Sequence, residues 1–203
     1  MALFRSRALK KAADAGYDPA RLPPGQYLTD KWPVLHAASV PRIDLSTWDF
    51  TVTGEVEEPL RLGWREFREL PATEVTVDIH CVTRWSRFDT TFKGVHWSEL
   101  AKLAGPRPTG RFVVAHAEQG FTANLPLEAI EDENALIAYE ADGEPLTPDH
   151  GGPVRLMVPS RYFWKSAKWL TGLELLDHDE PGFWERYGYH NDADYWKEQR
   201  YSF

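Results

Sequence analysis

The sequence has one cysteine and two methionines among its 203 residues, and it has no long apolar run. The single cysteine, Cys81, cannot form an intramolecular disulfide, and it excludes a structural zinc site built mainly on thiolates. Such sparse cysteine usage fits a reducing compartment. No stretch approaches the roughly 20 apolar residues that a transmembrane helix needs, so we expect no membrane span.

The N-terminus also lacks the pattern of an export signal. Arg5, Arg7, Lys10 and Lys11 are not followed by an apolar core, and the two arginines are not adjacent. We therefore expect a cytoplasmic location.

Positive charge is scarce, since 23 Lys and Arg against 31 Asp and Glu give a formal net charge of −8. Nucleic-acid-binding proteins typically carry a basic patch on a basic chain, so no nucleic-acid partner is expected. A local basic pocket for a small anion is still compatible with this balance. Aromatic residues, in contrast, are abundant, with nine Trp, eight Tyr and ten Phe. So many rings favour a packed core, with some rings left to line a pocket.

The sequence has no GxGxxG fingerprint and no regular alternation of strands and helices, which argues against a dinucleotide-binding fold. Apolar periodicity instead predicts many short strands with short helices between them. The predicted strands cover residues 48–52, 75–79, 111–116, 136–139, 154–158 and 168–175, and the predicted helices cover residues 64–70, 97–103 and 127–131. This order is typical of a single mixed, strand-rich α+β domain.

Two regions flank the predicted elements. Residues 1–33 are expected to form an irregular lead-in, because segment 18–25 (DPARLPPG) is rich in residues that break helices and strands. The domain itself is predicted to span residues 34–203, including a polar and aromatic tail that starts near Asp179.

Cys81 follows predicted strand 75–79, in which every second residue is apolar, and it continues that alternation. If the strand extends to Cys81, its sulfur would therefore lie on the same face as the apolar side chains. A lone cysteine is most often a small buried hydrophobe, and this interpretation stays open. However, His80, Arg84 and Arg87 lie close in the sequence, and cationic neighbours lower the pKa of a thiol and favour the thiolate. A thiolate is both a nucleophile and a ligand for soft or high-valent metals.

Residues 151–168 form the second concentration of chemically active side chains. The basic and hydroxyl side chains of this segment include Arg155, Arg161, Lys165, Ser166 and Lys168. Arginine and lysine with a hydroxyl and main-chain amides are a usual set for holding phosphate. The alternative is a solvated basic face.

Several segments, in this order, resemble the molybdenum-binding domain of the sulfite oxidase family. They are 79–86 (IHCVTRWS), 120–127 (GFTANLPL), 150–156 (HGGPVRL) with 165–169 (KSAKW), and the tail segments 182–185 (GFWE) and 188–190 (GYH). Each is modest alone, but their order makes the match specific, and the likeness extends from about Trp32 to Phe203, nearly the whole chain.

The resemblance implies the strand-rich α+β fold of that domain and a cofactor in which a pterin dithiolene holds molybdenum (molybdopterin). It implies that Cys81 is the protein ligand to the metal. It also implies a set of residues that hold the pterin and its phosphate, namely His36, Arg155, Lys165, Ser166 and Lys168. A plain hydrogen-bonded histidine is the alternative for His36.

The implied activity is a two-electron oxidoreduction, and we expect oxygen-atom transfer to or from a small oxo- or sulfur-containing substrate. The predicted catalytic residues are Cys81, Arg84 and Trp85. Arg84 or Arg87 would bind an anionic or oxo-bearing substrate, and Trp85 would form an aromatic wall. A surface charge is the alternative for Arg87. The sequence does not identify the electron donor or acceptor.

The chain also departs from true sulfite oxidases. We expect neither a haem domain nor the additional dimerisation domain, which makes the chain more similar to stand-alone bacterial members and to the catalytic subunit of methionine sulfoxide reductase. Phe121 stands where relatives have tyrosine, and Arg84-Trp85 replaces a pattern of several arginines. These departures argue against sulfite as the substrate.

Two other functions stay open. One is a metal-free enzyme with Cys81 as the nucleophile and a histidine as the base, although no signature of a known thiol hydrolase is present. His116 and His190 are histidines that would reach such a site or serve the structure alone. The other is a non-catalytic pterin-binding module, which likeness of fold does not separate from an enzyme.

Overall fold

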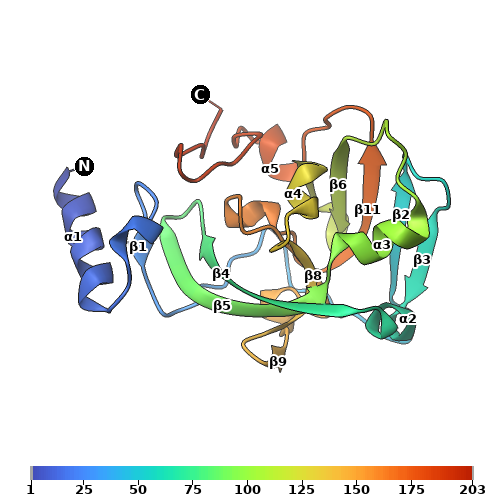
Figure 1. Ribbon diagram of the computed structural model, residues 1–203, viewed down its shortest axis with the longest axis horizontal. Coiled ribbons are helices and arrows are strands. Elements are labelled where there is room, and N and C mark those ends of the chain that lie inside the picture. The colour runs from blue at the N-terminus through green and yellow to red at the C-terminus, as the bar shows by residue number, and fades with distance from the viewer. Residues whose placement is uncertain (1, 203) are drawn as a thin grey trace.

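The computed structural model describes residues 2–202, and its two β-sheets pack around a shared apolar core (Figure 1). Within these residues the first sheet has six strands. They are β1 (Tyr27–Leu28), β4 (Ala72–His80), β5 (Trp85–Val95), β8 (Leu136–Ala141), β9 (Glu144–Pro145) and β10 (Arg155–Met157). The long strand β5 is central, because it pairs in parallel with β1 and antiparallel with β4 and β8.

The second sheet has five strands in the order β3-β2-β11-β6-β7. They are β2 (Asp49–Gly54), β3 (Leu60–Gly63), β6 (Phe112–Ala117), β7 (Thr122–Pro126) and β11 (Leu170–Leu176). β11 returns from the far end of the chain to lie parallel to β2 and antiparallel to β6. The predicted mixed, strand-rich α+β fold is therefore confirmed.

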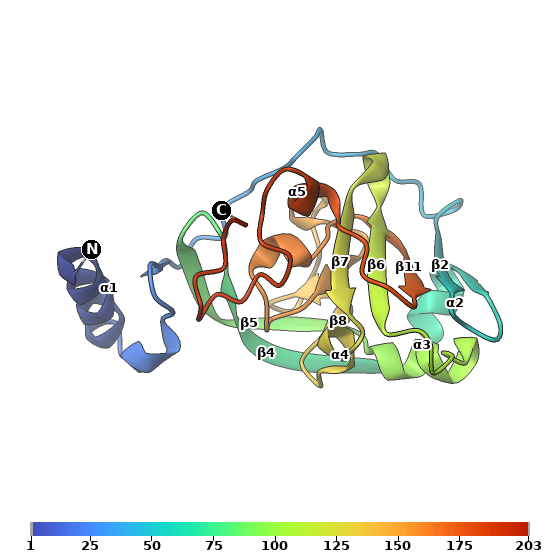
Figure 2. The ribbon, with the colours of Figure 1, turned by 90° about the horizontal axis from the view of Figure 1, so that it is seen from above.

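Short helices connect and cover the sheets, and none within residues 2–202 is long and apolar enough to cross a membrane. The α-helices are α1 (Ala2–Asp14), α2 (Trp64–Glu69), α3 (Trp97–Ala104), α4 (Glu128–Glu131) and α5 (Phe183–Arg186). Four 3₁₀ turns lie at η1 (Pro19–Arg21), η2 (Glu118–Gly120), η3 (Pro148–His150) and η4 (Phe163–Lys165). Figure 2 shows α1 at one end of the molecule, away from the second sheet.

Local sequence explains the elements that were predicted. In β2, Phe50 and Val52 are fully buried and alternate with more exposed residues, the pattern of a half-buried strand. Helix α3 begins after His96, whose ring accepts a hydrogen bond from the Ser98 amide. It ends at Gly105, which adopts the left-handed conformation that suits glycine at a helix C-terminus.

The longest strand, β5, was not among the predicted strands. Its inward positions alternate with period two, but they include Ser86, Thr90 and Gly94 beside Phe88 and Phe92. Polar and small residues on the buried face conceal the apolar alternation from which a strand is predicted.

The prediction that residues 1–33 are irregular is wrong for their first part, because α1 is helical. Ala8 and Ala12 are buried there against Leu22, Leu28 and Phe88, so tertiary packing stabilises an alanine-rich segment with good helix propensity. The breaker-rich segment 18–25 is irregular as expected, apart from the turn η1. The boundary at residue 34 stays a prediction.

Gly94 lies opposite Ala138 in the antiparallel pair of β5 and β8, at a shift in the register, and it tests how closely the two strands approach there. A Cβ atom added at Gly94 would lie 2.2 Å from the Ile137 carbonyl oxygen and 2.6 Å from the Ala138 Cα. We expect Gly94→Ala to lower the free energy of unfolding by about 3 kcal/mol, because two backbones must move apart. Denaturant unfolding measures this change.

Gly143→Ala is the matched control, since Gly143 has a φ of +83° but no atom within 4 Å of an added Cβ. That variant should lose only about 1–2 kcal/mol, the cost of a left-handed alanine. Equal losses in the two variants would contradict the close approach of β5 and β8.

Candidate active site

The candidate site starts at the loop that joins β4 to β5. The Cys81 amide donates to the Trp85 carbonyl at 2.9 Å, and the Arg84 amide donates to the Cys81 carbonyl at 2.9 Å. Arg84 closes the turn with a φ of 78°, a conformation uncommon for residues other than glycine. The turn brings Cys81, which is 7% exposed, to the wall of a cavity.

The sulfur of Cys81 is buried, and its polar partners come from the two residues that follow it, the Thr83 hydroxyl and the main-chain amides of Val82 and Thr83. The Thr83 hydroxyl contacts Sγ at 3.2 Å. Burial raises the pKa of the Cys81 thiol, while the Thr83 hydrogen bond and the positive charge of Arg200 lower it by less. The predicted lowering by Arg84 and Arg87 is wrong, because their guanidinium groups lie elsewhere.

Arg84 and Arg87 have their hydrogen-bond partners outside the cavity wall. Arg84 Nη1 lies 3.5 Å from the Gly25 carbonyl oxygen. Arg87 donates to Thr90 at 2.8 Å and to Asp142 at 2.6 Å. Neither residue lines the cavity, so the structure does not bring these two predicted substrate-binding groups to Cys81.

The cavity has a volume of about 430 Å³, a size typical of small-molecule sites. Six of the predicted site residues line it together: His36, Cys81, Trp85, Arg155, Ser166 and Lys168. Aromatic rings make up much of the remaining wall: Trp32, Phe121, Phe163, Trp164, Trp169, Phe183, Trp184 and Tyr189. The cavity thus joins the two regions that sequence analysis had singled out separately.

Arg155 is a buried cation whose hydrogen bonds go to main-chain carbonyls. It is 1% exposed, and it donates to the carbonyls of His150 at 2.9 Å and Ser166 at 2.7 Å. Its guanidinium carbon lies 4.2 Å from the centre of the Phe163 ring. No carboxylate of the described chain forms an ion pair with it, and burial lowers its pKa to about 9. An uncompensated buried charge of this kind is costly unless a bound anion neutralises it.

Lys168 adds a second positive charge beside Arg155. Its Nζ lies 2.9 Å from the Leu35 carbonyl oxygen, 2.7 Å from that of Asp149 and 3.1 Å from His36 Nδ1. Burial and the Arg155 charge lower the pKa of Lys168 to about 7. Two cations held mainly by carbonyls form an anion site, since both charges gain from a bound anion.

His36 and Ser166 complete this end of the cavity. Because a protonated Lys168 donates to His36 Nδ1, the His36 ring carries its proton on Nε2, which lies 3.8 Å from Asp149 Oδ1. Burial, followed by the Lys168 charge, lowers the pKa of His36. Ser166 Oγ accepts the Val158 amide at 3.0 Å, which leaves its hydroxyl proton free to bind an anion.

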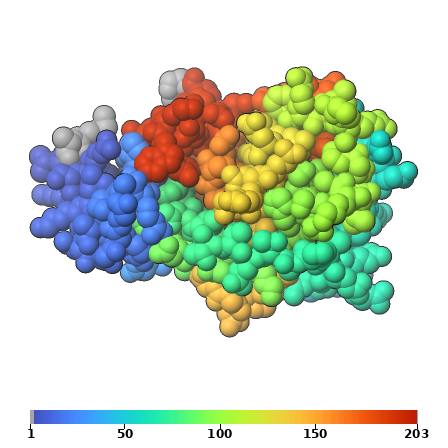
Figure 3. Space-filling view, viewed as in Figure 1, coloured from blue at the N-terminus to red at the C-terminus, as the bar shows by residue number. Residues whose placement is uncertain are grey.

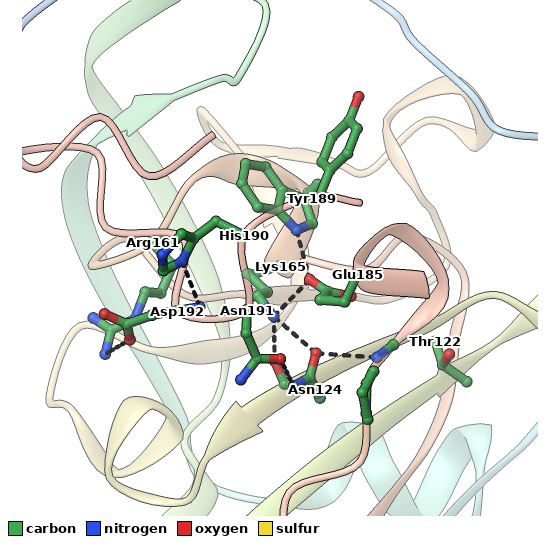
Figure 4. Close-up of polar contacts among 12 residues, drawn as sticks. Thr122, Asn124, Arg161, Lys165, Glu185, Tyr189, His190, Asn191 and Asp192 are labelled. Carbon is green, nitrogen blue, oxygen red and sulfur yellow. Dashed lines mark hydrogen bonds and ion pairs between the residues drawn. The ribbon is translucent and has the colours of Figure 1, made fainter. Parts of the chain in front are cut away.

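Lys165 does not line the cavity. Its fully buried Nζ contacts Glu185 Oε1 at 2.7 Å, the Asn124 carbonyl at 2.8 Å and Asn124 Oδ1 at 2.9 Å (Figure 4). Burial lowers the pKa of Lys165, and the Glu185 charge opposes that shift. This geometry therefore favours a structural role for Lys165 over the predicted direct contact with a cofactor.

The buried Lys165–Glu185 pair instead fixes one wall of the cavity. Glu185 Oε1 also accepts the Trp164 indole N–H at 2.8 Å. Phe183 and Trp184, which directly precede Glu185 on α5, line the cavity together with Trp164. The ion pair consequently holds the C-terminal tail against the core.

The two histidines considered as possible bases, His116 and His190, lie outside the cavity. His116 Nε2 contacts Glu174 at 2.8 Å on the second sheet, and His190 Nδ1 accepts the Asp192 amide at 3.1 Å. Both have structural partners and neither is among the lining residues, which fits their structural interpretation.

Sequence analysis missed most of the aromatic wall. Trp32 stacks on His150 with ring centres 4.0 Å apart and planes 16° apart, and the Arg155 guanidinium lies 5.7 Å from its ring. The excess of aromatic residues predicted that some rings would line a pocket, but not which ones. Their convergence depends on tertiary contacts between distant segments.

The protein side chains of the site do not form a complete metal centre by themselves. Residues 2–202 contain no group of three or more His, Cys, Asp or Glu side chains that could together hold a metal ion. A metal bound at Cys81 therefore needs its remaining ligands from a non-protein molecule, which the cavity has room to accept.

The anion site predicts a pH dependence of sulfate binding to the cofactor-free protein. The charged form of Lys168 is present below its pKa of about 7 and is lost above it, whereas Arg155 stays charged. Sulfate affinity should therefore fall about tenfold from about pH 6 to about pH 8. Isothermal titration calorimetry measures it. Lys168→Met should give weaker, pH-independent binding, and a flat wild-type profile would contradict the assignment.

Comparisons with known proteins identify relatives of this chain. The chain is 45% identical over 183 residues to the uncharacterized oxidoreductase YuiH of Bacillus subtilis (strain 168), covering 90% of this chain and 92% of that protein. It is 30% identical over 157 residues to the protein-methionine-sulfoxide reductase catalytic subunit MsrP of Gluconobacter oxydans (strain 621H). That match covers 68% of this chain but only 50% of the reductase.

The fold is also found in a solved structure. The sulfane dehydrogenase SoxCD from Paracoccus pantotrophus superposes with a TM-score of 0.65 and 23% identity, covering 71% of this chain and 42% of that one. The sequence model of the oxidoreductase molybdopterin binding domain matches residues 36–184. This chain belongs to the oxidoreductase molybdopterin-binding domain family, which includes sulfite oxidase and the MsrP reductase.

Proposed function

We propose that this oxidoreductase holds molybdenum through a pterin, with Cys81 as the protein ligand, and transfers an oxygen atom to or from a small uncharged substrate. The observation that carries the proposal is that one cavity is lined by a single thiol and by two basic side chains, Arg155 and Lys168, whose hydrogen bonds go mainly to main-chain carbonyls. The phosphate of a phosphorylated pterin dithiolene would supply an anion for the two cations. Its dithiolene sulfurs would supply further soft ligands for a metal bound at Cys81.

The donor set fits such a group. Arg155 and Lys168 would hold the phosphate, with Ser166 and His36 beside them. The aromatic walls, including Trp32 and Trp169, suit a flat ring system. When bound, the molybdenum centre supplies two-electron redox chemistry. The protein supplies position and electrostatics: Cys81 fixes the metal at the wall, and Thr83 orients the sulfur.

An uncharged substrate follows from the charges around Cys81. The basic groups of the cavity wall, Arg155 and Lys168, belong to the anion site just described. The side of the wall next to Cys81 carries Trp85, Trp164 and Tyr189, while Arg84 and Arg87 lie outside. The cations whose charges act on Cys81, Arg200 and Lys168, already donate to main-chain carbonyls, so an anion placed there would lose its hydration and gain little in return, which is costly.

The likeness to a protein named as a methionine-sulfoxide reductase supports a sulfoxide as the oxygen-bearing substrate. A sulfoxide is neutral and has an apolar body that suits an aromatic wall. The chain spans half the length of that reductase, so this activity is proposed on the site rather than transferred with the name.

The metal-free thiol enzyme is less well supported. Its general base would have to reach Cys81 Sγ, yet the nearby His80 donates or accepts at Ser86 Oγ over 2.8 Å and packs on Tyr195. Burial lowers the pKa of His80 to about 4. The hydrogen bond that reaches Sγ comes from Thr83, a group that does not act as a base.

A substrate panel tests the proposal. The protein is produced in a host that makes the molybdenum cofactor, and its molybdenum and pterin contents are measured. Artificial electron donors then drive reduction of dimethyl sulfoxide and methionine sulfoxide, and artificial acceptors drive oxidation of sulfite. We expect kcat/KM for a neutral sulfoxide to exceed that for sulfite by about tenfold or more, since an anion loses more hydration than a neutral sulfoxide on entering the aromatic part of the cavity.

Two results would overturn the proposal in different ways. Protein without molybdenum and pterin would remove the cofactor assignment. Loaded protein that prefers sulfite would leave the cofactor in place and contradict the uncharged substrate.

A further inference from the structure

The loop that carries Cys81 is held by a residue from the N-terminal segment. Gln26 is 1% exposed, and its Nε2 donates to the Cys81 carbonyl at 3.1 Å and to the Trp85 carbonyl at 3.2 Å. Those two residues are the two ends of the loop, so one buried amide joins both ends. The strand β1, which follows Gln26, pairs with the start of β5 and keeps the amide in place.

The same loop is held from the C-terminal tail. Arg200 is 6% exposed, and its Nη1 donates to the Val82 carbonyl at 2.6 Å while Nη2 donates to Gln26 Oε1 at 3.1 Å. Its guanidinium carbon lies 4.8 Å from the centre of the Tyr162 ring. Gln26 and Arg200 therefore form one continuous buried network with the main chain of residues 81–85.

The two terminal segments meet at close range. An added Cβ at Gly25 would lie 2.2 Å from Glu198 Oε1 and 3.1 Å from Arg200 Nη2. Gly25 has a φ of +70°, so both the close approach and the backbone conformation favour glycine. Figure 3 shows the N-terminal segment and the C-terminal tail side by side on this face of the molecule.

We propose that Gln26 and Arg200 are positioning residues for Cys81. They fix the main chain of the loop so that the sulfur stays at the cavity wall, where the proposed metal would bind. The inference rests on the proposed role of Cys81 as a ligand. Gln26 and Arg200 contact carbonyls rather than the cavity, so they act through the loop and not on the substrate.

The network also gives a function to segments outside residues 36–184, which the family model matches. Gln26 precedes that region and Arg200 follows it. A chain cut to the matched region would keep Cys81, Arg155 and Lys168 but would lose both groups that hold the Cys81 loop.

The test uses the full chain without its cofactor, in which the only thiol is Cys81. The rate of alkylation by iodoacetamide then reports how accessible the Cys81 sulfur is, and movement of the loop away from its position raises that rate. The variants are Gln26→Met, which keeps the side-chain length but removes the hydrogen bonds, and Arg200→Lys, which keeps the positive charge. Since charge is unchanged in both, the rate reports position. We expect each variant to react about tenfold faster than wild type.

Lys197→Gln is the matched control, because Lys197 lies on the same tail but pairs with Asp194 at 3.1 Å and is 66% exposed. Its alkylation rate should equal that of wild type. Rates unchanged in both Gln26→Met and Arg200→Lys would overturn the proposal. So would a rise of equal size in Lys197→Gln, which would indicate general loosening of the tail.

A second measurement covers the case in which a variant is globally less stable. In the loaded protein, the thiolate-to-metal absorption band should shift or weaken in Gln26→Met and Arg200→Lys, while the pterin content stays at the wild-type level. An unchanged band would contradict the positioning role. If wild-type protein takes up no molybdenum, the proposed function fails, yet the alkylation comparison still decides whether the network holds the loop.

Discussion

The buried charge of Arg155 is the constraint on which the rest of the site depends. Its guanidinium binds the carbonyls of His150 and Ser166, so one side chain joins the turn η3 to the segment after η4. Those carbonyls offset only part of the cost of burial, and no ion pair within the described residues completes it. The site is therefore arranged for an anion, and Lys168 adds charge to the same place.

Cys81 reaches this cavity from the other side, through contacts made by both ends of the chain. The N-terminal segment supplies Gln26, and the C-terminal tail supplies Arg200. The tail is itself fastened by the buried Lys165–Glu185 pair, next to rings that line the cavity. Two sheets thus form the core, but segments outside the sheets shape the site. Loss of either end should disturb the site before it disturbs the core.

Much of the fold could be predicted from the sequence, because most strands alternate apolar and polar residues. β5 could not, since Ser86, Thr90 and Gly94 occupy its buried face. α1 could not either, because its stability comes from contacts of Ala8 and Ala12 with residues further along the chain.

Part of the site could be predicted, because the chemistry of a thiol and of a basic cluster can be identified from the sequence. Cys81, Arg155 and Lys168, which were predicted to bind a cofactor, line one cavity, and their binding of a cofactor stays a prediction. Lys165 was expected in the cavity wall, but it follows Trp164 in a 3₁₀ turn, and its side chain contacts Glu185 instead. Arg84 was expected to bind substrate, but its backbone is left-handed and its side chain contacts the Gly25 carbonyl instead. The contacts of Gln26 and Arg200 with the Cys81 loop could not be predicted, since these residues lie 55 and 118 positions in the sequence from the carbonyls that they bind.

The most direct test of the central claim is molybdenum X-ray absorption spectroscopy on the loaded protein and its Cys81→Ser variant. If Cys81 is the protein ligand, the variant should show one sulfur neighbour fewer around the metal, with its pterin content unchanged because Arg155 and Lys168 still hold the anion. The same sulfur coordination in both proteins would contradict the account.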